Sequence, residues 1–249
     1  MFKTLITGAA KRVGAELARA CAADAHTVVL HYNQNKAAAE ALGDELRTKG
    51  ALIELVHADL CDSASVSDMM TAASKTGPIT GLINNASLFD YDDSETVSAE
   101  KIAHHMAVNL IAPALLIKDV AAQLPQGAKG CVINMLDAKL FGMNPDYYSY
   151  TLSKSALHTL TTMAAQAYAP NLRVNAIAPG ILLPSGGQNR AKFRAAHKRN
   201  LLGQGAEISE IVATMRLLLS AKSMTGEVIV LDGGAHLRPA ARDVAFLKD

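Results

Sequence analysis

Two residues near the middle of the chain, Tyr150 and Lys154, have types and spacing suited to proton transfer. They lie four residues apart in the stretch 146–168, whose apolar spacing predicts a helix, so both side chains face the same way. A free tyrosine has a pKa of about 10, and a nearby ammonium favours the phenolate, which makes the hydroxyl a better proton donor and acceptor near neutral pH. The same pair also arises by chance on ordinary helices, so its interpretation depends on the residues around it.

The first turn of the chain has the glycines of an anion-binding site. The apolar run Phe2–Thr7 leads into Gly8-Ala9-Ala10-Lys11-Arg12-Val13-Gly14, after which a helical pattern begins. Gly8 can form the tight turn, and Gly14 allows the helix to pack close to the sheet. A pyrophosphate would then lie at the helix N-terminus, where free N–H groups and the helix dipole favour an anion. The spacing departs from GxGxxG, and such a turn can also be purely structural.

The residues after the second apolar run indicate which nicotinamide cofactor the chain would bind. This run ends at His31-Tyr32-Asn33, and no acid occurs between Asp24 and Glu40. NAD enzymes usually place an acid here to hold the ribose 2′-OH. Lys11 and Arg12 instead provide two cations in the glycine-containing turn, which suits the 2′-phosphate of NADPH. The alternative is that both are solvated surface cations.

These groups must be positioned by strands and helices that alternate along the whole chain. The alternation predicts an α/β fold: a doubly wound (Rossmann) seven-stranded parallel sheet with helices on both faces, in one domain covering residues 1–249. The predicted strands are Phe2–Thr7, His26–Tyr32, Leu52–His57, Ile79–Asn84, Gly130–Met135, Arg173–Ile177 and Val228–Leu231. The predicted helices are 13–23, 35–49, 63–75, 99–124, 146–168 and 207–220.

One long stretch, 179–206, is rich in glycine and proline and follows no regular pattern. It would lie at the carboxyl edge of the parallel sheet, where ligands of such folds bind. We therefore expect its part 181–206 to be a substrate loop that closes over the site.

Composition excludes several classes of partner. With 24 Lys and Arg against 23 Asp and Glu in 249 residues, the net charge is +1, and no nucleic-acid or membrane partner is expected. Cys21, Cys61 and Cys131 are far apart and form no CxxC pair, which argues against disulfides and a zinc site. His104 and His105 have no evident third ligand and are predicted to be surface or interface residues, so no metal is expected. We find neither a signal peptide nor an apolar stretch of membrane-spanning length, and expect a cytoplasmic protein.

The order of the short motifs resembles the short-chain dehydrogenase/reductase family over essentially the whole chain. The matching motifs are Thr7-Gly8…Gly14, Asp59-Leu60, Asn84-Asn85-Ala86, Asn109, Tyr150-x-x-x-Lys154, Pro179-Gly180 and Asp232-Gly233-Gly234. The resemblance implies that Asp59 and Leu60 flank the adenine and that Asn85 and Ala86 line the cofactor. It implies that Lys154 also holds the nicotinamide ribose, and that Asn109 kinks its helix and helps to carry a proton-relay water. Further cofactor-binding residues implied by the resemblance are His31, Tyr32, Asn33, Val13, Ser87, Pro179 and Gly180.

The chain departs from the family pattern at two positions, and in both it resembles the pteridine reductase branch of the family, which includes bacterial dihydromonapterin reductases. Arg12 replaces the middle glycine of the first loop, and Asp137 stands where the family has a catalytic serine. The opening Thr7–Arg12, the His31-Tyr32 pair and the run Asn85-Ala86-Ser87-Leu88-Phe89 are also similar to that branch.

The branch resemblance suits a planar heterocycle with ring nitrogens and an exocyclic amine. The carboxyl group of Asp137 can accept a hydrogen bond from such a ring or donate one when protonated. Phe89 could stack on the ring face opposite the nicotinamide, although it could also be a core residue. Arg12 and Ser87 could contact the polar edge of the pterin or the cofactor phosphates.

The resulting prediction is an NADPH-dependent reductase of dihydromonapterin, dihydrobiopterin or dihydrofolate. Hydride would pass to a ring C=N carbon, and Tyr150, with Lys154 and Asp137, would supply or relay the proton. The first alternative is a carbonyl reductase acting on a ketone, sugar or acyl substrate, which Asp137 argues against. The second is a non-catalytic NADP-binding regulator, which the intact catalytic residues argue against. The resemblance also implies a homotetramer formed through the two long helices.

Overall fold

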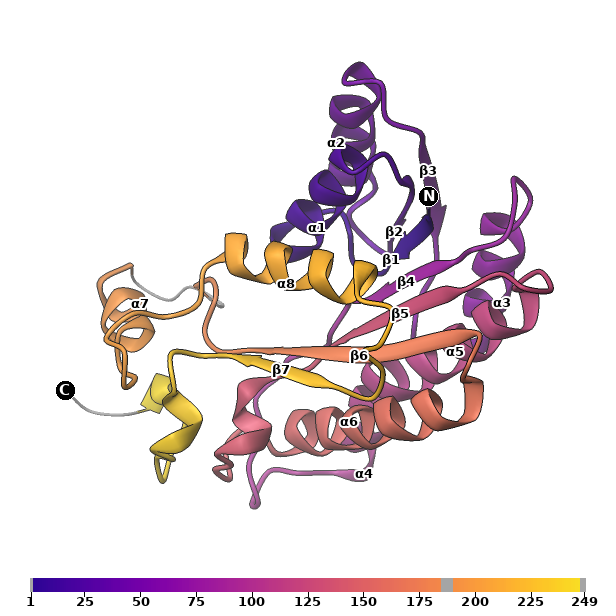
Figure 1. The fold of residues 1–249 in the computed structure, drawn as a ribbon. Helices are drawn as coiled ribbons and strands as arrows, with labels where there is room; N and C mark the ends of the chain where they lie inside the picture. Colours follow the sequence, from indigo (N-terminus) through magenta and orange to yellow (C-terminus); the bar gives the residue numbers. More distant parts are fainter. Residues whose placement is uncertain (1, 185–189, 247–249) are drawn as a thin grey trace.

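Seven parallel strands form one twisted sheet at the centre of the molecule (Figure 1). The computed structural model describes residues 2–184 and 190–246. The strands are ordered β3-β2-β1-β4-β5-β6-β7. Strands β2 and β3 are added on one side of β1 and the later strands on its other side, so the strand order reverses between β1 and β4. Such a switch point is where open α/β sheets bind ligands. The strands are β1 (Lys3–Ile6), β2 (Thr27–Tyr32), β3 (Ile53–His57), β4 (Gly81–Asn84), β5 (Gly130–Met135), β6 (Leu172–Pro179) and β7 (Val228–Leu231).

Helices cover both faces of this sheet, which confirms the predicted doubly wound fold (Figure 1). One face carries α1, α2 and α8, and the other carries α3, α4, α5 and α6. Every predicted strand is present, with ends within two residues of those expected. The helices flanking the sheet are α1 (Arg12–Ala23), α2 (Lys36–Thr48), α3 (Ser63–Ala73), α4 (Ala99–Met106), α5 (Ala112–Gln123), α6 (Tyr148–Tyr168) and α8 (Ile208–Ser220).

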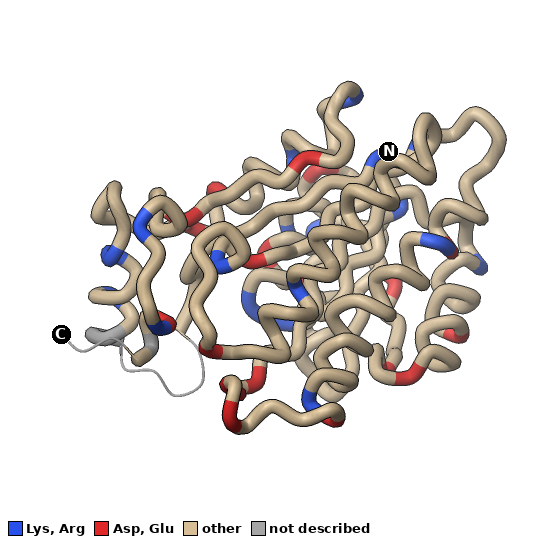
Figure 2. Tube along the Cα trace, turned by 90° about the horizontal axis from the view of Figure 1, so that it is seen from below, with Lys and Arg blue, Asp and Glu red and all other residues tan. Residues whose placement is uncertain are grey.

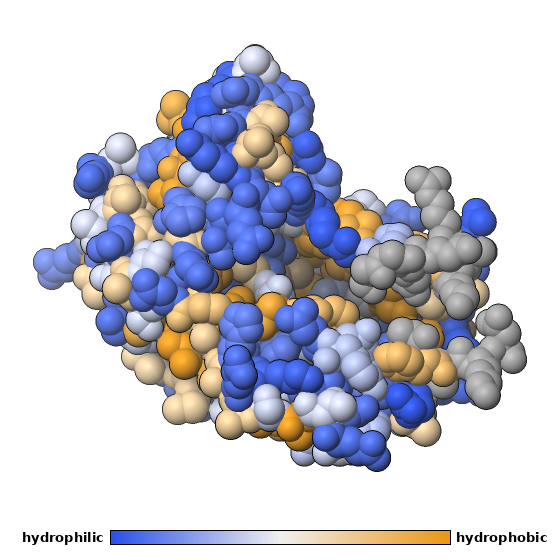
Figure 3. Space-filling view, turned by 180° about the vertical axis from the view of Figure 1, so that it is seen from behind, coloured by the Kyte–Doolittle hydropathy of each residue, from blue (hydrophilic) through white to orange (hydrophobic). Residues whose placement is uncertain are grey.

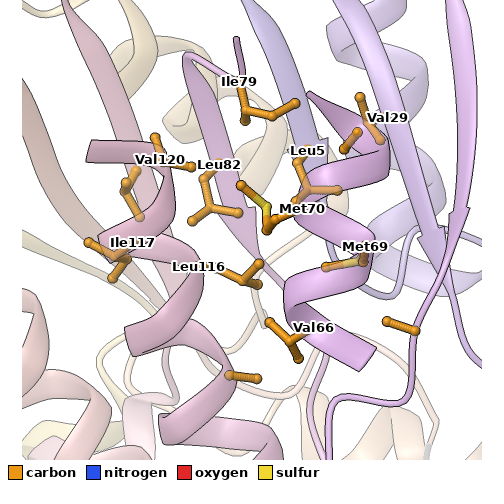
Figure 4. Packing of buried hydrophobic residues seen from close by; sticks show 14 of the residues in the cluster. Leu5, Val29, Val66, Met69, Met70, Ile79, Leu82, Leu116, Ile117 and Val120 are labelled. Atoms are coloured by element: carbon orange, nitrogen blue, oxygen red, sulfur yellow. The ribbon is translucent and has the colours of Figure 1, made fainter. Parts of the chain in front are cut away.

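The core consists of two main apolar layers, one on each side of the sheet. On the face of α3 and α5, Met69 and Met70 pack with Leu116 and Ile117 against strand residues such as Leu82 (Figure 4). All six residues of β5 are buried, as expected for a central strand covered on both sides. Burial of this apolar surface fixes the sheet register and therefore the positions of the strand ends.

The helical run from α4 to α5 corrects one sequence prediction. By length and composition alone, the run Ala99–Gln123 could cross a membrane, whereas no stretch of that kind was expected. The prediction rested on an unbroken apolar run, and Lys118 and Asp119 interrupt a helix that is apolar on average. In the structure, Leu116, Ile117 and Val120 of this run are buried in the core on the side of α3 (Figure 4).

The stretch 179–206 is more regular than its composition predicts. The strand β6 continues through Pro179, and the helix α7 (Arg190–His197) occupies part of the expected loop. The sequence of α7 consists mainly of good helix formers, but the glycines and prolines around it hide so short a helix. Residues 185–189 of the expected substrate loop lie outside the described residues.

Charged residues of both signs are interspersed along the chain (Figure 2). Two ion pairs join neighbouring helices: Arg19 of α1 with Glu45 of α2, and Arg216 of α8 with Asp24 at the end of α1, each 2.7 Å apart. Exposed pairs of this kind contribute little to stability. The carboxyl edge of the sheet, in contrast, carries polar groups that are buried.

Candidate active site

Two adjoining cavities lie at the carboxyl edge of the sheet. The smaller one, of about 420 Å³, follows β1, β2 and β3, and the larger one, of about 700 Å³, follows β5, β6 and β7. Ser87, just after β4, lines both of them. Figure 3 shows the surface hollowed on this side, with hydrophobic residues inside the hollow. An elongated ligand could therefore extend from one cavity into the other across the switch point.

Most of the predicted site residues line one of these cavities. Those at the smaller cavity are Gly8, Lys11, His31, Tyr32, Asn33, Asp59, Leu60, Ala86 and Ser87. Those at the larger cavity are Arg12, Val13, Ser87, Phe89, Asp137, Tyr150 and Gly180. Pro179 is the last residue of β6, directly before Gly180. The remaining predicted residues do not line a cavity but contact residues that do: Gly14, Asn85, Asn109 and Lys154.

The glycine-containing turn is held by a buried histidine. Gly8 has a φ of 64°, a conformation that favours glycine, and its N–H donates to Nδ1 of His31 at 3.0 Å. The Nε2 atom of His31 lies 3.1 Å from the carbonyl oxygen of Ala58, so Nε2 carries the proton. Burial lowers the pKa of His31 to about 4, and the ring is neutral at physiological pH. The histidine thus links the turn after β1 to the end of β3.

Asn85 holds the same turn from behind. Its Nδ2 atom donates to the carbonyl oxygens of Thr7 at 2.9 Å and Gly8 at 3.3 Å. The hydroxyl of Thr7 accepts the backbone N–H groups of Asn85 and Ala86, each at 3.0 Å. A Cβ atom at Gly14 would lie 2.7 Å from Nδ2 of Asn85, which explains the glycine there. Asn85 therefore positions the turn, whereas Ala86 lines the cavity.

The N-terminus of α1 lies where the two cavities meet. Lys11 at its N-cap lines the smaller cavity, and Arg12 and Val13 line the larger one. No side chain among the described residues caps this helix, whereas Asp62 and Ser98 cap α3 and α4. The first N–H groups of a helix lack intrahelical acceptors. An anion bound between the cavities would satisfy them.

Lys11 and Arg12, both of which the sequence analysis placed near a 2′-phosphate, line different cavities, and Arg12 lies in the one that also holds Tyr150. The Nζ atom of Lys11 donates to Oδ1 of Asn35 at 2.6 Å, beside the end of β2. The Nη1 atom of Arg12 donates to the carbonyl oxygen of Pro184 at 3.0 Å. The reason is local: Arg12 has a left-handed φ of 55°, so its side chain leaves the turn in a different direction from that of Lys11.

The catalytic candidates meet at the larger cavity. The Tyr150 hydroxyl donates to Oδ2 of Asp137 at 2.7 Å, and Oδ1 of Asp137 accepts the backbone N–H of Lys139 at 2.8 Å. Burial and the negative charge of Asp137 raise the pKa of Tyr150 well above 10. The direction of this shift is opposite to the one expected from Lys154 alone. The hydroxyl is a protonated donor that faces a carboxyl group.

The position of Lys154 explains this outcome. Its Nζ atom donates to the carbonyl oxygen of Met135 at 2.7 Å and lies 5.9 Å from the centre of the Tyr150 ring. Burial, opposed by the charge of Asp137, lowers the pKa of Lys154 to about 8. The two residues share one side of α6, as their spacing predicts, but the ammonium is held by the end of β5 rather than by the phenol.

Asn109 lies in a π-helical turn, Ala107–Ile111, which confirms the expected distortion of its helix. Its Oδ1 atom accepts the backbone N–H of Leu88 at 2.9 Å, and its Nδ2 atom donates to the carbonyl oxygen of Leu88 at 3.0 Å. It also donates to Oγ of Ser153 at 2.9 Å, and Ser153 donates to the carbonyl oxygen of Tyr150 at 2.7 Å. Asn109 thus ties the loop after β4 to the helix that carries Tyr150.

Phe89 lies on the wall of the larger cavity and is 42% exposed, so it is not a core residue. One face stacks on Tyr147, with ring centres 4.3 Å apart and an interplanar angle of 14°. Its ring also meets that of Tyr150 at 85°, with centres 4.7 Å apart. Tyr147 precedes α6 and was not anticipated, because no local pattern distinguishes it from an ordinary tyrosine at the start of a helix.

The histidines of α4 differ from their prediction in part. His105 is buried rather than exposed, and its Nε2 atom accepts the backbone N–H of Asp90 at 3.3 Å. His104 is exposed and lines the smaller cavity. Within the ranges 2–184 and 190–246, no cluster of His, Cys, Asp and Glu could hold a metal ion.

The C-terminal segment also contributes to the site, and no sequence pattern predicted this contribution. Asp232 accepts hydrogen bonds from the backbone of Gly234 and from the backbone and ring of His236. His236, Arg238 and Arg242 line the larger cavity together with Asp232. The Asp232-Gly233-Gly234 motif locates the beginning of this wall, but nothing in the sequence indicates that the chain then returns across the cavity.

Comparison with known proteins agrees with this geometry. A family model described as Enoyl-(Acyl carrier protein) reductase matches residues 8–236. The structure of FolM Alternative dihydrofolate reductase 1 from Brucella suis, in complex with NADP, superposes with a TM-score of 0.92 at 36% identity, covering 97% of this chain and 98% of that one.

Two curated relatives cover nearly the same span. Pteridine reductase 1 of Leishmania tarentolae is 30% identical over 279 residues, covering 95% of this chain and 96% of the relative. L-xylulose reductase of Mesocricetus auratus is also 30% identical, over 243 residues, covering 93% and 95%. The family match and the seven-stranded sheet with its two cavities lead to one conclusion: the chain belongs to the short-chain dehydrogenase/reductase family.

Proposed function

We propose that the protein is an NADPH-dependent reductase that acts on a ring C=N bond of a pterin-type substrate. Dihydromonapterin, dihydrobiopterin and dihydrofolate are the candidate substrates. The observation that carries the proposal is the hydrogen bond from Tyr150 to Asp137, at 2.7 Å, on the wall of the larger cavity. Similarity to a pteridine reductase and to an alternative dihydrofolate reductase supports the same substrate class.

The two cavities fit the two ends of a dinucleotide cofactor. Tyr32, Asn33 and Leu60 would flank the adenosine, and Lys11 would meet the 2′-phosphate beside the end of β2. The N-terminus of α1 would hold the pyrophosphate, and Gly180 would lie beside the nicotinamide. Bound NADPH would supply the hydride. The similar Brucella suis protein is in complex with NADP, which supports the choice of cofactor.

Tyr150 would provide the proton for the reduced ring. Because burial and Asp137 hold its pKa well above 10, the hydroxyl stays protonated until a substrate nitrogen becomes basic enough to accept the proton. Asp137 would orient this hydroxyl and accept hydrogen bonds from the N–H groups of the pterin. Lys154, held at Met135 behind the tyrosine, would stabilise the negative charge left on the phenol oxygen.

The aromatic lining of the larger cavity suits a flat ring. Phe89 keeps one face on Tyr147 and remains 42% exposed, so the rest of its surface is available to a planar substrate. Offset stacking of two aromatic rings contributes about 0.5–1.5 kcal/mol beyond the burial of apolar area. A ketone or a sugar would gain little from this wall.

A carbonyl reductase is the rival function, and the similarity to L-xylulose reductase favours it. Asp137 discriminates between the two functions. A single serine hydroxyl suits a ketone oxygen, whereas a carboxylate, which only accepts hydrogen bonds, would repel a developing alkoxide. An aspartate at this position is therefore better suited to a substrate that presents N–H donors.

The test measures kcat/KM for a dihydropterin and for a panel of ketones and sugars, with NADPH as reductant. We expect the wild type to prefer the dihydropterin. Asp137→Ser should sharply lower this activity and can gain weak ketone reduction, and Asp137→Ala should lose the activity without unfolding. A wild type that ignores every pterin but reduces ketones readily would overturn the proposed substrate class.

A further inference from the structure

The C-terminal segment 238–246 is joined to the body of the protein by ion pairs, of which Arg242 with Asp146, at 2.7 Å, is shorter than Lys139 with Asp243, at 3.9 Å. Both Nε and Nη2 of Arg242 contact the carboxylate of Asp146, with N–O distances of 2.7 to 2.9 Å. The backbone N–H of Asp243 donates to the same carboxylate at 2.6 Å. Asp146 is only 1% exposed, and the hydrogen bonds of Arg242 hold its pKa below the usual value. This contact is therefore a buried, charge-assisted attachment of the segment.

The anchor point, Asp146, belongs to the turn that leads into the catalytic helix. The next residue, Tyr147, has a left-handed φ of 52°, and α6 begins directly after it. The carbonyl oxygen of Asp146 also accepts a hydrogen bond from Nζ of Lys139, a residue on the wall of the larger cavity. The segment is therefore attached within four residues of Tyr150.

A chain of aromatic contacts connects the same segment to the reacting groups. Phe246 packs against Tyr91, with ring centres 5.0 Å apart, and the guanidinium carbon of Arg242 lies 5.2 Å from the Phe246 ring centre. Tyr91 meets Tyr147 edge-on at 5.2 Å, and Tyr147 stacks on Phe89. Phe89 in turn contacts Tyr150. Phe246, through Tyr91, thus packs against the aromatic wall of the larger cavity, which Tyr147 and Phe89 form.

The segment itself also lines the larger cavity, through Arg238, Pro239, Ala240, Arg242, Asp243 and Val244. We propose that the segment is a fixed wall of the substrate cavity and that Arg242, through Asp146, is a positioning residue that sets substrate affinity. This inference rests on the proposed function, because it assigns a specificity element to the same cavity. Breaking the ion pair would release the wall and leave a buried carboxylate without its partner.

The kinetic test compares Arg242→Ala with Arg216→Ala. Arg216 forms a similar ion pair with Asp24, but on the outer surface between α8 and α1, away from the cavity. For Arg242→Ala we expect KM for the substrate to rise about tenfold or more, as for the loss of a bidentate charged contact. The kcat value and the NADPH dissociation constant should change less than about threefold. Arg216→Ala should leave all three values near wild type.

Rescue by the conservative variant separates positioning from general damage. Arg242→Lys keeps the charge but loses the bidentate contact with Asp146, so its KM should lie between those of wild type and Arg242→Ala. Equal KM values for the wild type and Arg242→Ala would overturn the proposal. A fall in kcat and a loss of NADPH affinity, with KM unchanged, would also overturn it.

A second measurement is independent of the substrate. Asp146→Asn keeps the shape of the side chain but removes its charge, and trypsin can cleave after Arg242 once the segment is released. We expect faster cleavage at this bond in Asp146→Asn than in wild type, monitored by mass spectrometry, and no change in the control Asp24→Asn. Equal cleavage rates would show that the ion pair does not fasten the segment.

The two measurements also separate the inference from the proposed function. If the wild type reduces ketones and no dihydropterin, the proposed substrate class fails, and the KM comparison is made with the ketone. Faster cleavage in Asp146→Asn together with a raised KM in Arg242→Ala would then still support the wall. Faster cleavage with an unchanged KM would reject its role in substrate affinity.

Discussion

The two cavities are built in different ways, although they adjoin at the same edge of the sheet. The smaller cavity is formed mainly by strand ends, whose backbone atoms are tied by His31, Thr7 and Asn85. The larger one is lined by side chains whose positions depend on pairs such as Asp137 with Tyr150 and Arg242 with Asp146. Sheet register therefore positions the first, whereas long-range polar and aromatic contacts position the second.

This difference indicates where changes in sequence are tolerated. Backbone geometry at the smaller cavity persists as long as the sheet forms, so a nucleotide site of this kind can be kept while many side chains change. The larger cavity depends on individual side-chain pairs, and each can be altered to suit another substrate. Similarity to reductases of both pterins and a sugar is consistent with this division.

The largest expected effect comes from removing the donor in the larger cavity. Tyr150→Phe keeps the ring contact with Phe89 but deletes the hydroxyl that faces Asp137. We expect kcat to fall by about 10² to 10⁴, the usual contribution of general acid catalysis, with NADPH affinity nearly intact. Tyr148→Phe, on the exposed side of the same helix, is the matched control and should retain wild-type kcat. Wild-type turnover by Tyr150→Phe would remove the catalytic assignment.

A pH profile tests the buried charge of the same cavity. Because burial lowers the pKa of Lys154 to about 8, its ammonium is present below that pH and is lost above it. If this charge stabilises the phenol oxygen during proton transfer, kcat should fall above pH 8 by about tenfold per pH unit. The measurement is kcat at saturating substrate, with NADPH affinity followed over the same range. A kcat that stays constant to about pH 10, the value for an ordinary lysine or tyrosine, would contradict this role.

Much of the smaller cavity could be predicted from the sequence, because its residues follow directly from strand ends. The turn at Gly8 and the run His31-Tyr32-Asn33 needed only the alternation of apolar and polar segments to be placed. The directions in which side chains point were harder to predict. Arg12 leaves its turn toward the larger cavity because of its left-handed backbone, which no periodicity reveals.

The larger cavity could be predicted only in part. Spacing placed Tyr150 and Lys154 on one side of a helix, but it did not indicate that the ammonium donates to the carbonyl oxygen of Met135. The pairing of Asp146 with Arg242 joins residues 96 positions apart, and neither belongs to a recognisable motif. Such contacts depend on how loops return over the sheet, which local sequence patterns do not determine.

Cofactor preference tests whether the smaller cavity works as its geometry indicates. Lys11→Ala removes the ammonium beside Asn35 at the end of β2, where the 2′-phosphate of NADPH would lie. We expect the NADPH dissociation constant to rise about tenfold, the usual value of one charge-assisted hydrogen bond, and that of NADH to change little. Arg12→Ala, whose side chain faces the larger cavity, should alter substrate KM more than this preference. Equal losses of NADPH and NADH affinity in Lys11→Ala would contradict the assignment.

The smallest expected effect is on stability. It is measured by comparing a helix cap supplied by a residue far away in the sequence with a cap supplied by the residue directly before its helix. Asp92, fully buried, accepts the backbone N–H of Ser149 at 2.9 Å and its hydroxyl, and so caps α6 from the loop after β4. Asp62 caps α3 locally, at 2.9 Å from the N–H of Ala64. Asp62→Ala should cost about 1 kcal/mol, as for an ordinary cap.

Asp92→Ala should cost more, about 2–3 kcal/mol, because it leaves buried donors of Ser149 without an acceptor. It should also lower kcat several-fold, since the capped turn lies directly before Tyr150, whereas Asp62→Ala should leave kcat unchanged. Urea denaturation of both variants gives the free energies of unfolding, and NADPH oxidation gives kcat. Equal losses of stability would mean that the start of α6 is held by its packing alone, and that the aromatic wall rather than the polar cap positions the catalytic tyrosine.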